Sequence, residues 1–305
     1  MKKFTAIALF IILVVSLFGC TAPERKESEK ISIITTLFPQ YDFCREITGD
    51  KAEIKLLLPP GVESHTFEPT SADIIEIEKA DVFIYTGDSM EAWAGKIIGS
   101  LNNMNLRVVD ISENITMKET QGHHEHNHSH ERDPHIWTSP KNAMIIVKHI
   151  LRNLIEADPE NADYYTTNAN NYIRRLGNLD LDFRALVEKS TKDKIIFGGR
   201  CAFLYFLEEY GLDYMSAYAS CSTENEPSAD NLTNIIDTVK KEKISAVYYE
   251  ELTDPKIGRT ICEETGAELL LLHSCHNVSQ EDFESGVTYL SLMQQNLENL
   301  RKGLQ

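Results

Sequence analysis

Short apolar runs alternate with longer stretches whose apolar residues recur every three or four positions, from Ile31 to the end of the chain. The short runs are predicted to be buried strands, at residues 31–35, 53–58, 81–85, 194–197, 244–249 and 267–272. Strands that alternate with helices are typical of a parallel sheet covered by helices. The pattern therefore predicts an α/β protein with two parallel-sheet domains, one in each half of the chain.

Capping signals mark where several helices begin. The segment from Thr70 to Asp73 has the form of a capping box. Ser139 places a cap residue before a first-turn proline, and Pro159 stops the helix that begins there. Further helices are predicted at residues 203–210, 228–243, 255–265 and 280–304.

Residues 160–190 are predicted to form one long helix. They contain no proline and a single glycine, Gly177. Apolar residues follow one another at helical spacing: Tyr165, Ala169, Tyr172, Leu176, Leu179, Phe183 and Leu186. A helix of this length would join an N-terminal domain of residues 31–159 stiffly to a C-terminal domain of residues 191–305.

The chain opens with the features of a secretory signal. Two lysines precede an apolar segment, residues 4–18, and Gly19 stands before Cys20. The segment is too short and too abruptly ended for a spanning helix. Because a cysteine after a small residue resembles a bacterial lipobox, we expect residues 1–20 to form a lipoprotein signal peptide, Cys20 to carry the lipid and residues 21–30 to be a tether. An uncleaved signal anchor is the alternative, and with either the body lies outside the cytoplasm.

Composition and charge narrow the choice of partner. Hydrophobic residues make up 42% and charged residues 25% of the chain, which is globular composition. The formal net charge of −17 disfavours nucleic acid and would attract cations, although solubility explains an acidic surface equally well. Besides the lipobox cysteine there are five others: Cys44, Cys201, Cys221, Cys262 and Cys275. No C-x-x-C motif appears, so a thiolate zinc finger is not expected, and any pairing among the five stays open.

Residues 122–132 form a His-rich stretch before the sequence Asp133-Pro134-His135-Ile136-Trp137. It holds half of the ten histidines: His123, His124, His126, His128 and His130. Imidazole is a common ligand for Zn²⁺, Cu²⁺ and Ni²⁺, so this stretch is predicted to capture metal. A solvated polar loop without a ligand is the alternative.

Other candidate ligands follow predicted strands. Ligands of open α/β sheets bind beyond the carboxyl ends of the strands. His65 lies in a loop shaped by two prolines and a glycine after the strand that ends near residue 58. Other polar residues follow later strands: Glu250, Glu251, His273, Cys275 and His276. A cleft between the two domains could therefore be lined from both sides.

The motif P-P-G-x-x-x-H-x-F-E-P at residues 59–69 and the motif D-P-H-x-W at residues 133–137 resemble the zinc and manganese receptor family of ABC-type importers. The His-rich loop, the connecting helix and residues 289–297 resemble it too. The resemblance implies a monomeric surface lipoprotein that holds one divalent ion between its domains and delivers it to a membrane permease. It also implies that His65 and His135 are metal ligands.

The sequence departs from this family at the third ligand. Arg200 stands where the family usually supplies a histidine or glutamate, and a guanidinium has no lone pair to give. The family's fourth ligand is typically an aspartate, which this chain replaces by the segment 273–277. His276 is our first candidate for the missing donor, before the Cys275 thiolate and then Glu250; an exposed loop histidine is the alternative. Arg200 is expected to pair with Glu250 or with the next residue, Glu251.

Imidazole ligands favour Zn²⁺, whereas Mn²⁺ prefers carboxylates and water. The sequence therefore predicts a zinc receptor and not an enzyme, with a receptor for manganese or another divalent metal as the alternative. An exported zinc hydrolase would need a general base such as Glu63 or Glu68, and neither H-E-x-x-H nor G-x-S-x-G appears. A surface adhesin is the remaining alternative, but no repeat or large apolar surface marks one.

Overall fold

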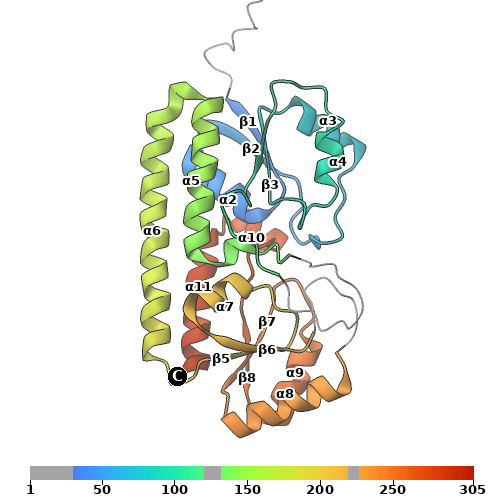
Figure 1. Ribbon diagram of the computed structural model, residues 1–305, viewed down its shortest axis with the longest axis vertical. Helices are drawn as coiled ribbons and strands as arrows, with labels where there is room; N and C mark the ends of the chain where they lie inside the picture. Colours follow the sequence, from blue (N-terminus) through green and yellow to red (C-terminus); the bar gives the residue numbers. More distant parts are fainter. Residues whose placement is uncertain (1–29, 120–131, 219–226) are drawn as a thin grey trace, which may run out of the picture. The chain divides into compact units, whose positions relative to one another are not determined.

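The computed structural model describes residues 30–119, 132–218 and 227–305, and the chain from Ile31 to Gln305 forms one compact unit (Figure 1). Several predicted features lie outside the described residues: Cys20 and its signal, the tether up to residue 29, the five clustered histidines and Cys221. None of the helices that the structure describes is both long enough and apolar enough to cross a membrane.

Two parallel sheets form the centres of the two domains, as predicted. The first has the order β2-β1-β3-β4, with β1 at Ile31–Thr35, β2 at Ala52–Leu56, β3 at Val82–Tyr85 and β4 at Arg107–Asp110. The second has the order β6-β5-β7-β8, with β5 at Lys194–Phe197, β6 at Asp213–Ser216, β7 at Ala246–Tyr249 and β8 at Glu268–Leu271. In a parallel sheet all carboxyl ends share one edge, so the loops that follow the strands collect there.

Helices cover both sheets. Those of the N-terminal domain are α2 (Phe38–Thr48), α3 (Ser71–Lys79), α4 (Ala94–Ile98) and α5 (Pro140–Ala157), with short 3₁₀ turns at Ile136–Thr138 and Pro159–Asn161. Those of the C-terminal domain are α7 (Leu204–Tyr210), α8 (Ala229–Glu242), α9 (Lys256–Thr265), α10 (Gln280–Ser285) and α11 (Tyr289–Leu304). The predicted caps are present, because Thr70 accepts a hydrogen bond from the Asp73 amide and Ser139 accepts one from the Asn142 amide.

The single helix predicted at residues 280–304 is wrong. Gly286 ends α10 in the left-handed conformation (φ 76°), and Thr288 caps the start of α11. Glycine adopts this conformation without steric cost, so the chain turns there instead of continuing as one helix.

The connecting helix α6 (Ala162–Lys189) is present as predicted. Its 28 residues correspond to a length of about 42 Å at 1.5 Å per residue. Figure 1 shows it alongside α5 and past both sheets, and it packs on α2 and α5 of one domain and on α7 and α11 of the other. All seven apolar residues predicted for its inner face are buried. Polar contacts hold its two halves, since Asn168 donates to the Ile47 carbonyl (3.1 Å) and Asp180 accepts from the Tyr210 hydroxyl (2.9 Å).

Buried hydrogen bonds also join the two domains directly. The Trp137 indole donates to the Ser274 carbonyl (2.8 Å), and the Tyr289 hydroxyl donates to the Trp137 carbonyl (2.6 Å). The Asn277 side chain donates to the carbonyls of Pro59 and Val62, both at 2.9 Å. One hydrophobic cluster runs through this contact and includes residues of both domains.

Tyr289→Phe should lower the free energy of unfolding by about 1–3 kcal/mol, because it leaves the buried Trp137 carbonyl without its hydroxyl donor. Urea unfolding measures the change. Tyr164→Phe is the matched control, since Tyr164 is 41% exposed and its hydroxyl makes no hydrogen bond within the described part of the chain. Equal stabilities of the two variants would show that the hydrogen bond does not help to hold the domains together.

Candidate metal site

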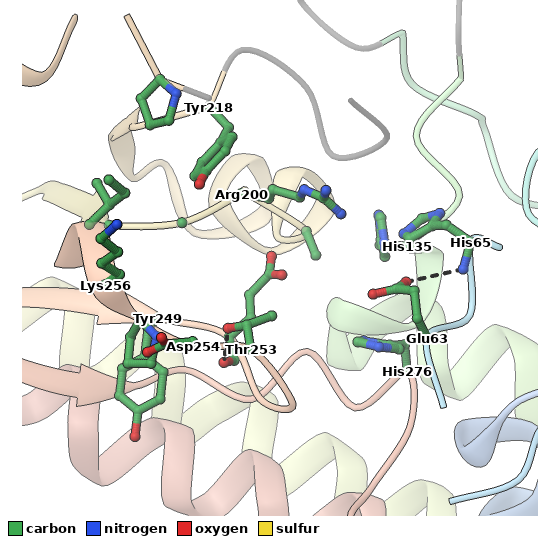
Figure 2. A pocket seen from close by; sticks show the side chains of 17 residues that line it. Glu63, His65, His135, Arg200, Tyr218, Tyr249, Thr253, Asp254, Lys256 and His276 are labelled. Atoms are coloured by element: carbon green, nitrogen blue, oxygen red, sulfur yellow. Dashed lines mark hydrogen bonds between the residues drawn. The ribbon is translucent and has the colours of Figure 1, made fainter. Parts of the chain in front are cut away.

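A cavity of about 510 Å³ opens between the domains at the carboxyl ends of the strands (Figure 2). The N-terminal domain contributes Glu63, His65 and His135. The C-terminal domain contributes the rest of the wall, including Arg200, Glu250 and His276. The structure thus brings together the two histidines implied by the family resemblance and the first candidate for the missing donor.

His65 is held by the loop that follows β2. Gly61 turns this loop in the left-handed conformation (φ 81°), and its amide donates to the Val278 carbonyl (2.8 Å) of the other domain. The His65 amide donates to Glu63 Oε1 (3.1 Å). Burial, together with the neighbouring His135, lowers the pKa of His65 to about 4. The ring is therefore neutral at pH 7 and can offer a lone pair.

His135 is oriented by an aspartate two residues before it. Asp133 Oδ1 accepts a hydrogen bond from the His135 amide (2.8 Å) and lies 3.0 Å from Nδ1 of the ring. A carboxylate at Nδ1 fixes the tautomer that carries its proton there, so Nε2 keeps a free lone pair. The ring also packs edge-on against Trp137, with centroids 5.6 Å apart.

His276 has a comparable support on the opposite wall. Its Nδ1 lies 2.6 Å from Ser274 Oγ and 3.1 Å from Glu251 Oε1. The serine hydroxyl and amide both donate to the same carboxylate, at 2.7 Å each. Burial lowers the pKa of His276, but the Glu251 charge outweighs it, so the net pKa lies above the usual value. Burial alone would raise the pKa of Glu251, but the charges of His273 and His276 hold it well below the usual range.

The spacing of the first pair of rings suits one ion. The His65 and His135 centroids are 5.4 Å apart and the rings are inclined by 64°. Two imidazoles bound tetrahedrally to one zinc at a Zn–N distance of about 2.1 Å have centroids about 5 Å apart. Across residues 30–119, 132–218 and 227–305, no three His, Cys, Asp or Glu side chains already stand at coordinating distance from one point. The structure therefore places two candidate donors at a spacing that suits one ion, and no third candidate among the described residues yet shares a point with them.

Cys275 is not brought to the cavity. Its backbone is left-handed (φ 65°), its side chain is fully buried, and its Sγ donates to the His273 carbonyl (3.5 Å). Burial raises the pKa of its thiol well above the usual value, which disfavours the thiolate that would bind a metal. His273 also lies away from the cavity wall, where its Nδ1 accepts a hydrogen bond from the Cys275 amide (3.0 Å).

Glu250 also lines the cavity, where its carboxylate is a candidate metal ligand. Its Oε1 is buried and accepts no hydrogen bond from the described residues. Burial and the adjacent Glu251 charge raise the pKa of Glu250 to about 7. A metal ion nearby would favour its ionised form.

The predicted ion pair of Arg200 with Glu250 or Glu251 is wrong. Over the ranges that the structure describes, Arg200 forms no ion pair with either glutamate. Figure 2 shows its guanidinium directed toward His135 instead. The physical reason in the case of Glu251 is that its carboxylate is already bound by Ser274 and His276.

Sequence reasoning missed the residues that orient the imidazoles. Asp133 and Ser274 each stand two positions before a histidine whose Nδ1 they contact, and Glu63 stands two positions before His65. A polar residue at this spacing before each candidate histidine is a signal that the sequence does contain. Tyr218 and Lys256 also line the cavity, and no motif in the sequence marks them.

Comparison with known proteins identifies the family of this chain. The family model described as zinc-uptake complex component A, periplasmic, matches residues 33–303. The chain belongs to this family. Its description places members outside the cytoplasm, as parts of a zinc-uptake complex.

Individual members of the family and solved structures agree with the match. The high-affinity zinc uptake system protein ZnuA of Bacillus subtilis is 34% identical over 285 residues, which are 91% of this chain and 89% of that protein. The zinc-binding lipoprotein AdcA of Streptococcus pneumoniae is 31% identical over 310 residues, and the match spans 61% of its length. The crystal structure of the Zn(II)-bound ZnuA-like domain of AdcA has a TM-score of 0.77 at 29% identity, with 90% of this chain and 99% of that domain covered.

Asp133→Ala should weaken zinc binding by roughly 10–100-fold, because it removes the carboxylate that orients the His135 ring. Calorimetric titration of the chelator-stripped protein with Zn²⁺ measures the effect. Asp237→Ala, on the exposed face of α8, is the control for loss of one carboxylate. If both variants bind zinc as the parent does, His135 is not a ligand that depends on Asp133.

Proposed function

We propose that this protein is an extracytoplasmic zinc receptor that binds one Zn²⁺ in the cavity and delivers it to an ABC permease for uptake. The observation that carries the proposal is the meeting of His65, His135 and His276 in one cavity between the domains. Nδ1 of His135 and of His276 is engaged by a carboxylate or a hydroxyl, which leaves Nε2 as the donor atom. An all-imidazole set suits Zn²⁺ better than Mn²⁺.

The assignment of ligands is part of this proposal. His65 and His135 would hold the ion first, because their spacing fits a common metal, and His276 would complete a three-nitrogen set from the other domain. Glu250 is the second candidate for a C-terminal donor, since its carboxylate lines the same cavity and has a buried oxygen without a hydrogen bond from the described residues. Cys275 is a weaker candidate because its thiol lies outside the cavity.

We also propose that the receptor acts as a monomer anchored to the membrane surface by a lipid on Cys20. The sequence around Cys20 supports the anchor, through the small residue before it and the apolar segment before that. The five histidines between residues 123 and 130 would collect zinc weakly. A zinc receptor requires no catalytic group, because its cavity serves to bind and release the ion.

Replacement of either His65 or His135 by alanine should weaken zinc binding by at least about 100-fold, since each removes one of the few ligands that give structural zinc its affinity. His276→Ala should weaken it as well. Metal analysis and calorimetric titration with Zn²⁺ and with Mn²⁺ measure these changes, with one tight zinc expected for the parent. If instead the parent prefers Mn²⁺, or the His65 and His135 variants keep the parent's affinity, the proposed site is wrong.

Deletion of residues 123–130 should leave the one tight zinc in place and reduce zinc uptake only when zinc is scarce. The reason is that these histidines would add weak binding outside the cavity and raise the local concentration of the ion. Uptake of ⁶⁵Zn at limiting and at ample zinc measures the effect. Loss of all zinc binding with this deletion would overturn the cavity as the binding site, and unchanged uptake at limiting zinc would overturn the role of the loop.

A further inference from the structure

The cavity extends well beyond the three imidazoles. Its volume of about 510 Å³ greatly exceeds the share of one water molecule in the liquid, about 30 Å³. In Figure 2 the imidazoles of His65, His135 and His276 lie at one end, and Arg200 lies between them and the part of the wall that carries Tyr218 and Lys256. A single ion at the imidazoles would leave most of this space to other molecules.

The charges around the cavity are unbalanced once a divalent cation enters. Arg200 and Lys256 both line it, and neither side chain forms an ion pair within the described residues. Among the lining carboxylates, Asp254 is paired with Arg259. Among the lining carboxylates of the described residues, Glu63 and Glu250 then remain to face the ion.

Glu63 and Glu250 would neutralise at most the two charges of the metal. The carboxylates of Asp133 and Glu251 lie behind the rings and are engaged there by their own hydrogen-bond donors. The Arg200 guanidinium would still be a positive charge in the cavity, and it faces the imidazole of His135, where the ion would lie. Lys256 adds a second positive charge on the exposed part of the wall. A fixed cation beside a metal site repels the metal unless an anion lies between them. Three nitrogen donors also leave one position of a tetrahedral zinc open.

Resting on the proposed zinc site, we propose that the cavity takes zinc together with a small polycarboxylate anion. One carboxylate of the anion fills the open position on the metal and contacts the Arg200 guanidinium, and another reaches toward Lys256. A guanidinium presents a planar pair of N–H donors that matches a carboxylate, and carboxylate oxygen is an ordinary zinc ligand. The species that the receptor binds is then a zinc chelate.

Citrate is the probe, and zinc affinity is measured at fixed free Zn²⁺ by competition with an indicator in a non-coordinating buffer. Citrate should tighten zinc binding by tenfold or more, and equilibrium dialysis with radiolabelled citrate should retain one citrate per protein only when zinc is present. Acetate, which has one carboxylate, should give a smaller gain. Inorganic phosphate tests whether any oxyanion suffices; a gain equal to that of citrate would overturn the polycarboxylate assignment.

Two variants separate the roles of the cations. Arg200→Gln should bind zinc without citrate at least as tightly as the parent, because a repulsive charge is gone, and should lose the gain that citrate gives. Lys256→Gln should reduce the gain with citrate and leave the gain with acetate unchanged. Lys241→Gln, on the exposed end of α8, controls for net charge and should behave as the parent in every titration. Thermal unfolding of each variant confirms that it is folded.

Two negative results have different meanings. If zinc binds tightly through His65 and His135 and citrate at fixed free zinc has no effect, then Glu250 or water completes the site; the chelate is overturned and the receptor function stands. If zinc does not bind at these histidines with or without citrate, the proposed function fails as well.

Discussion

The contact between the two domains is the constraint on which the site depends. Trp137 and Tyr289 are both fully buried and linked by a hydrogen bond, and the Trp137 indole reaches the loop after β8. Trp137 lies two residues after His135, and Ser274 lies two residues before His276. The same buried contact therefore links the loops that carry the candidate donors on opposite walls, and α6 packs on both domains beside it.

The electrostatics of the cavity follow from this burial. Removal from water favours the neutral form of His65 and raises the pKa of Glu250 to about 7, so Glu250 carries only part of a negative charge at neutral pH in the cavity without metal. The negative charge that matters most for His276 lies behind it, on Glu251. This carboxylate accepts hydrogen bonds from the hydroxyl and the amide of Ser274 and contacts the His276 ring, so it does not face the cavity. This arrangement turns imidazoles toward the cavity and keeps a fixed carboxylate behind His135 and behind His276.

The fold could be predicted from the sequence because its strongest patterns are local. The inner face of α6 and the cap at Ser139 depend on residues within one or two helical turns. The edge strands β4 and β6 were not predicted, since polar residues interrupt their apolar runs. The partners of Arg200 and the direction of Cys275 were not predictable for another reason: one depends on which groups across the cavity are already bound, and the other on one left-handed residue that turns a side chain away.

The side chain of Asn277 links the two loops that carry His65 and His276. Its buried side-chain amide, next to His276 in the sequence, donates hydrogen bonds to two carbonyls of the loop that carries His65. Because this one side chain spans both loops, the position of the candidate donor on one wall is tied to the position of the candidate donor on the other. A shift of either loop is therefore passed to the other through one amide group, and this link does not run through the helices α5, α6 and α11.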